Sequence, residues 1–213
     1  MPNKSNNDTE ERDLTLDVAA ALSDVIGSRR SVSPKWLGEP GPAADEIEQM
    51  IGAAITAPDH DNLRPWRFVV IAGAGRDKLG DVFAEAKRRR SPGVDPSEVE
   101  RERERGKQAP VTIAVIACPV RDNAKVPLRD QYVSLGAAVQ NILLFCHGLG
   151  YGAKTLSGAK VNDAFNCKAL GVKQDEELVC FICIGTPKAP PRKRPRPDVA
   201  DHLTLWTGEN IET

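Results

Sequence analysis

Residues 44–71 read ADEIEQMIGAAITAPDHDNLRPWRFVVI. Apolar side chains recur at helical spacing at positions 47, 50, 51, 54 and 55, so we predict a helix over 44–57 that Pro58 ends. The apolar run 68–71 is typical of a short buried strand. The polar loop between them places amide, imidazole and guanidinium groups beside Trp66, a combination that suits a planar heterocyclic ligand.

Outward from this stretch, apolar runs alternate with segments of helical spacing. We predict helices over 16–26, 77–90, 96–108, 130–148 and 162–170, and strands over 111–118, 152–155 and 178–185. Asp95 and Pro96 form a start signal for the 96–108 helix, whose Glu-Arg repeat at 100–105 we interpret as a solvent-facing surface. Apolar strands separated by helices indicate an α/β or α+β fold with a small sheet covered on both faces.

Composition narrows the class of protein. The 213 residues carry 29 Lys and Arg against 30 Asp and Glu, a net charge of −1, which argues against nucleic acid or an anionic membrane as the main partner. No apolar run approaches the roughly 20 residues of a membrane span, and residues 1–13 show no secretory signal. Cys180 and Cys183 stand on a predicted strand, which points them to opposite faces. We therefore expect buried thiols, no bound metal and a reducing, cytoplasmic setting.

The two ends of the chain differ from its middle. Residues 1–13 are polar and predicted to be a disordered tail, and 14–187 form the folded domain. Residues 188–213 form a proline-rich, extended arm. It ends in Leu203, Leu205 and Trp206, apolar residues that we expect to pack on a second subunit.

Two basic elements have more than one interpretation. Arg29-Arg30-Ser31 clusters two guanidiniums and a hydroxyl at a turn, which suits a phosphate but is equally the composition of an exposed surface pair. The basic run that contains Arg194 and Arg196 is either a solvated charge run or a nucleic-acid patch. The chain lacks a dinucleotide-type glycine turn after a strand, a P-loop, a metal-hydrolase motif and a nucleophile elbow.

Taken in order, these elements resemble one family, the flavin-dependent nitroreductases, from about residue 24 to 197. The match is closest to the small branch of NAD(P)H nitroreductases that carry A-P-D-H, here at 57–60, followed by Asn62 and the Pro-Trp at 65–66. Arg29-Arg30-Ser31, the stretch 148–159 and Gly185-Thr-Pro resemble three further family motifs. The resemblance implies an α+β fold: an FMN-dependent nitroreductase-like three-layer α-β-α sandwich around a small mixed sheet, dimeric with an extended C-terminal arm.

The resemblance also assigns residues to FMN. Arg29 and Ser31 would bind its phosphate, with Arg30 at the ribityl chain or pyrimidine edge, and Arg194 and Arg196 would close on the phosphate from the arm. A second group would sit near the isoalloxazine, some of its members reaching the flavin bound mainly by the partner subunit: Thr56, His60 and Asn62. A third group would line the ring: Thr155, Leu156, Ser157 and the backbone near Gly158. The stretch 143–148 corresponds to one assigned to the nicotinamide nucleotide.

The resemblance implies an enzyme in which flavin N5, and no catalytic side chain, is the reactive centre. NAD(P)H would deliver a hydride to FMN and leave, and a small electron-poor acceptor of nitroaromatic or quinone type would replace it in a ping-pong sequence. A flavin storage or sensing protein with little turnover is the alternative, and a nucleic-acid accessory that uses the arm is a third. The chain departs from the family at Arg64, where Gln is common, and at 154–156, where Trp-Arg is common. The resemblance also implies that the charged segment 85–110 falls in helices that cover the substrate.

Overall fold

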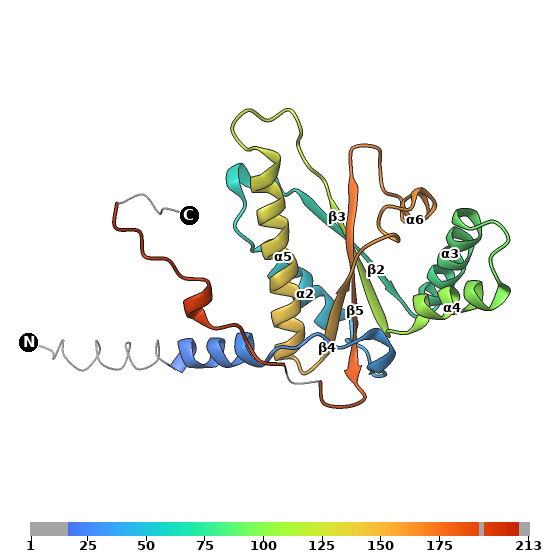
Figure 1. Cartoon of the computed structure of the whole chain (residues 1–213), viewed down its shortest axis with the longest axis horizontal. Coiled ribbons are helices and arrows are strands. Elements are labelled where there is room, and N and C mark those ends of the chain that lie inside the picture. The colour runs from blue at the N-terminus through green and yellow to red at the C-terminus, as the bar shows by residue number, and fades with distance from the viewer. Residues whose placement is uncertain (1–16, 192–193, 209–213) are drawn as a thin grey trace, which may run out of the picture.

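The computed structural model describes residues 17–191 and 194–208, and an antiparallel sheet lies at their centre (Figure 1). Its strands are β1 (Leu37–Gly38), β2 (Trp66–Ala72), β3 (Val111–Ala117), β4 (Gly152–Leu156) and β5 (Glu177–Pro187). The helices are α2 (Ala44–Ile55), α3 (Gly75–Arg90), α4 (Pro96–Lys107), α5 (Leu128–Gly148) and α6 (Ala164–Ala169), preceded by an N-terminal helix described over 17–28. Short 3-10 turns are η1 (Pro34–Trp36), η2 (His60–Asn62) and η3 (Val199–Asp201). The tail predicted over 1–13 lies outside the described residues.

The long strand β5 organises the sheet, because it pairs antiparallel with β3, β4 and β1. β2 joins on the far side of β3. We expected a mixed sheet, and among the described residues the only parallel pairing is an isolated bridge between Ser31 and Ala153, outside the named strands. That bridge matters for the site, since it fixes the chain just after the N-terminal helix to the start of β4.

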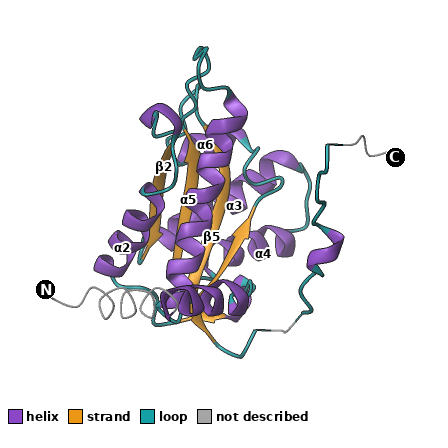
Figure 2. Cartoon of the chain, turned by 90° about the vertical axis from the view of Figure 1, so that its left-hand side faces the viewer, coloured by secondary structure: helices purple, strands orange, loops and turns teal. Residues whose placement is uncertain are grey.

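Helices α2 and α5 cover one face of the sheet. Met50 of α2 and Ile142 of α5 are fully buried against Ile113 and Ile182, which point to this face from β3 and β5. Figure 2 shows α5 in front of the strands in the view from this side. The helical spacing of apolar residues in these two segments therefore corresponds to a real packing face.

Helices α3 and α6 cover the opposite face, which completes the three layers (Figure 1). Phe83 of α3 meets Phe181 of β5 edge to face, with ring centres 5.5 Å apart. α4 packs on α3 at a contact made of two glycines, where a Cβ on Gly106 would lie 2.6 Å from the Cα of Gly80. No larger residue fits there without displacing backbone.

Strand alternation places the two cysteines as predicted. Cys180 is buried in the core beneath α2 and α5, and Cys183 is buried in a separate cluster with Val32 and Leu37. Burial raises the pKa of the Cys180 thiol to about 11, so this cysteine is present as the thiol at neutral pH.

Both ends of the described chain lie beyond α5, at the left of Figure 1. In the described part of the arm, the chain forms the 3-10 turn η3, where the N–H group of Ala200 donates to Asp198 Oδ1 at 3.0 Å. Leu205 and Trp206 are about four-fifths exposed, at 82% and 78%. Among the described residues, no helix combines the length and apolar character needed to cross a bilayer.

Candidate functional site

The turn after the N-terminal helix is fixed to the edge of the sheet. The N–H group of Val32 donates to the carbonyl of Ala153 at 3.0 Å, next to the bridge formed by Ser31. Val32 points into the buried cluster and Ser31, its neighbour in an extended chain, is exposed. The sheet edge thus holds the Arg29-Arg30-Ser31 turn in a defined position.

The C-terminal arm returns to this turn. Arg196 Nη2 donates to the carbonyl of Arg29 at 2.8 Å and to that of Gly27 at 3.0 Å. Arg194 and Arg30 line one groove together with Ser28 and three prolines of the arm. We call Arg29, Arg30, Arg194 and Arg196 the arginine cluster. The structure brings all four together with Ser31, although the arm lies more than 160 residues away in sequence.

The arginine cluster concentrates positive charge. Burial, Arg196 and Arg30 together lower the pKa of Arg29, and burial with Arg29 and Arg30 lowers the pKa of His147, whose Nε2 lies 2.8 Å from Ser28 Oγ. Within the described parts of the chain, no carboxylate lies within ion-pair distance of the cluster. Like charges held together without a counter-ion suit a phosphate group. His147 lies in the 143–148 stretch, but its position beside the turn was not predicted.

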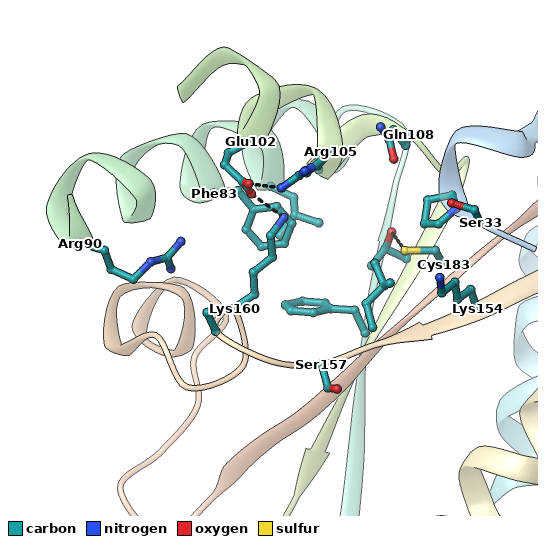
Figure 3. Close-up of a pocket in the computed structure, with 17 residues that line it drawn as sticks. Ser33, Phe83, Arg90, Glu102, Arg105, Gln108, Lys154, Ser157, Lys160 and Cys183 are labelled. Carbon is teal, nitrogen blue, oxygen red and sulfur yellow. Dashed lines mark hydrogen bonds and ion pairs between the residues drawn. The ribbon is translucent and has the colours of Figure 1, made fainter. Parts of the chain in front are cut away.

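A cavity of about 390 Å³ opens beside β4, between β5 and the α3–α4 pair (Figure 3). Its apolar wall contains Leu79, Phe83 and Phe181, and the predicted residues Leu156 and Ser157 line it. Thr155 and Gly158 are exposed and absent from the lining residues. Strand alternation turns Thr155 to the opposite side of β4 from Lys154 and Leu156.

A partly buried ion pair lies in the wall of the cavity. Lys160 Nζ lies 2.9 Å from Glu102 Oε2 and 3.9 Å from the centre of the Phe83 ring, and Arg105 also pairs with Glu102 (Figure 3). Burial lowers the pKa of Lys160 despite this pairing. Burial also opposes ionisation of Glu102, but Lys160 and Arg105 outweigh it and lower the pKa of Glu102. The prediction that the whole 100–105 repeat faces solvent is therefore wrong at Glu102.

The remaining predicted residues lie elsewhere on the same chain. Thr56 closes the end of α2, where its hydroxyl donates to the carbonyl of Ala53, and His60 and Asn62 belong to η2. Asp61 of η2 lies 3.9 Å from Lys125, which precedes the start of α5.

The arginine cluster, by contrast, adjoins His147 in the last turn of α5. The 21 residues of α5 span roughly 30 Å, so η2 and the cluster lie near opposite ends of this helix (Figure 1). One chain alone does not bring both groups to one ligand.

The sheet is antiparallel and lies between two helical layers, with the arginine cluster and the cavity beside its edge strand β4. This α+β architecture agrees with the fold that the sequence resemblance predicts. The family model described as "Nitroreductase family" matches residues 26–186. The chain is 31% identical over 165 residues to "Putative NAD(P)H nitroreductase YdjA" of Escherichia coli K12. The aligned region covers 78% of this chain and 87% of that protein. The chain belongs to the nitroreductase family.

Solved structures share this fold. The crystal structure of a nitroreductase-like family protein from Bacillus cereus superposes with a TM-score of 0.75 at 21% identity, covering 88% of this chain and 96% of the other. A protein from Desulfovibrio desulfuricans described as "a putative nitroreductase in complex with fmn" has a TM-score of 0.66 at 25% identity, covering 87% of this chain and 96% of the other. The predicted family and three-layer fold are thereby confirmed.

Proposed function

We propose that this protein is an FMN-dependent oxidoreductase that takes a hydride from NAD(P)H and passes it to an electron-poor acceptor of nitroaromatic or quinone type. One observation carries the proposal: an arginine cluster, for which the described residues provide no counter-ion, lies beside the start of β4, and an aromatic-lined cavity borders the same strand. The names of relatives support it, because the E. coli relative is named an NAD(P)H nitroreductase and the Desulfovibrio structure contains FMN.

The residues present fit both the phosphate and the ring of FMN. The arginine cluster and Ser31 would hold the phosphate. From the bridge at Ala153, β4 runs along the cavity, which Lys154, Leu156 and Ser157 line, and Ser157 lies four residues, about 13 Å, beyond the bridge. The aromatic and aliphatic wall suits the ring, and Gly158, with φ at +86°, adopts a backbone conformation that other residues resist. Bound FMN supplies the hydride chemistry, while the chain binds it, orients it and excludes water.

We further propose a homodimer in which each flavin lies between subunits. His60 and Asn62 would serve the flavin of the partner, because in their own chain η2 and the arginine cluster lie near opposite ends of α5. Thr56, at the end of α2, would lie near the isoalloxazine as the resemblance implies. Exposed apolar residues supply a surface for such contact: Val133, Leu149, Leu203, Leu205 and Trp206. Light scattering during size exclusion is expected to give a flavin-loaded species near twice 23.1 kDa, and an active, loaded species of 23 kDa would contradict the dimer.

Steady-state kinetics test the proposed activity. Initial rates measured with NAD(P)H and a quinone or nitroaromatic acceptor are expected to give parallel double-reciprocal lines, since the reductant leaves before the acceptor binds. A protein that binds FMN and turns over neither acceptor would favour storage or sensing instead. A protein that binds no flavin would contradict both.

A further inference from the structure

A basic groove adjoins the cavity on its outer side. It is lined by the end of α3 and by residues 159–168, among them Arg89, Arg90, Asn162, Phe165 and Lys168. Resting on the proposed function, we propose that this groove binds the adenosine end of the reductant and selects NADPH by its 2′-phosphate. Arg89 and Lys168 are the groups that would contact this phosphate.

The groove is continuous with the cavity. Arg90 and Ala159 line both spaces, and Figure 3 shows Arg90 at the edge of the cavity, on the α3 side of Lys160. The cavity, at about 390 Å³, lies at the small end of the range for ligand pockets and must also take the flavin ring. A dinucleotide whose nicotinamide reaches the flavin must therefore leave its adenosine end outside the cavity. The groove can take that end, because it is continuous with the cavity at Arg90 and Ala159.

The basic side chains of the groove outnumber the carboxylates that pair with them. Arg88 and Arg89 share the single carboxylate of Glu85, at 3.3 and 2.9 Å. Asp163 is fully engaged, because it accepts from Arg90 at 2.5 Å and from the N–H groups of two residues at the start of α6. Within the described ranges, Lys168 has no carboxylate within 4 Å. Two cationic charges thus remain for an anion.

Arg89 is held in place for this contact. Its guanidinium lies 4.3 Å from the centre of the Phe165 ring, and its Nε bonds Glu85. The side chain remains 60% exposed, so the guanidinium retains N–H groups that face solvent. A guanidinium stacked on an aromatic ring loses less freedom when it binds a phosphate than a freely rotating one does.

The 2′-phosphate separates the two reductants. NADH and NADPH share the nicotinamide and the pyrophosphate, so contacts to those groups cannot discriminate between them. Only NADPH carries the additional dianionic phosphate, and a charge-assisted contact to it changes affinity by about 10- to 100-fold. The groove is therefore expected to favour NADPH by that factor, and to favour it less at high salt.

The test uses the FMN-loaded protein and a redox-inactive fragment. Isothermal titration is expected to show that adenosine 2′,5′-bisphosphate binds at least about tenfold more tightly than adenosine 5′-monophosphate. Arg89→Gln and Lys168→Gln should each abolish most of this difference and lower the ratio of kcat/KM for NADPH to that for NADH. Arg129→Gln is the matched control, because Arg129 is 86% exposed on α5 and should change neither quantity.

The outcomes separate this inference from the proposed function. Equal binding of the two adenosine nucleotides, or a preference for NADPH that survives both substitutions, would overturn the groove assignment. Reduction by NADH alone would also overturn it and leave the proposed oxidoreductase standing. If neither reductant bleaches the flavin, the proposed function fails, and the titration still decides whether the groove binds the 2′-phosphate.

Discussion

Replacing Arg29 with alanine separates ligand binding from folding in a way that most site substitutions do not. Arg29 stands among like charges, since burial, Arg196 and Arg30 all lower its pKa. In the protein without FMN, Arg29→Ala removes repulsion and, among the described residues, breaks no ion pair. We therefore expect the flavin-free protein to keep or gain thermal stability.

The same substitution should weaken FMN binding strongly. A charge-assisted hydrogen bond contributes about 1.5–3 kcal/mol, which corresponds to about 10- to 150-fold in the Kd. Riboflavin has the same ring and ribityl chain but no phosphate, so its Kd should be nearly unaffected by Arg29→Ala. The loss is thus assigned to the contact between the guanidinium and the phosphate.

Titration of the flavin-free protein, followed by quenching of flavin fluorescence, measures both constants. Arg129→Ala, a change at an exposed arginine of α5, is the control for a general loss of positive charge. An unchanged Kd for FMN in Arg29→Ala would refute the phosphate assignment. Equal losses for FMN and riboflavin would refute it as well, because they would place Arg29 at the ring.

Two further predictions concern stability. Hydrogen bonds from Arg67, at 2.9 and 2.6 Å, lower the pKa of Glu176 to about 2. The Arg67–Glu176 pair therefore stabilises the folded protein fully above the ordinary carboxyl pKa of about 4.3, and this contribution is lost as the pH falls toward 2. Glu176→Gln should cost about 1.5–3 kcal/mol at pH 7 and flatten the acid dependence of urea unfolding; an unchanged acid limb would contradict this. Gly106→Ala should destabilise the protein by about 1–3 kcal/mol through its contact with Gly80, whereas Gly52→Ala, with open space at the Cβ, should stabilise it by about 0.5–1 kcal/mol. Equal midpoints in thermal melts of these two variants would count against the glycine contact.

Local signals predicted most of the fold because they act within a few residues. Asp95 caps α4 as its sequence position indicates, accepting from Ser97 N at 2.7 Å. Alternation along β5 was enough to separate Cys180 from Cys183. The association of the arm with the arginine turn came from the family resemblance, since nothing local in the arm indicates where it returns.

The cavity could not be derived in the same way. Glu102 and Lys160 are 58 residues apart, and they meet only because α4 and the turn after β4 both border the cavity. A signal was nevertheless present in the sequence. Val99, Glu102 and Gly106 are spaced by three and four residues, the inward stripe of a helix, and all three are buried. The alternating charges of the 100–105 repeat hid this stripe.

The central claim is that FMN bound to this chain accepts a hydride from NAD(P)H. Its most direct test is the absorbance spectrum of the FMN-loaded protein before and after anaerobic addition of NADPH, repeated with NADH. We expect rapid loss of the oxidised flavin band with at least one of the two reductants and its return when a quinone is added. An oxidised flavin band that persists with both reductants would contradict it.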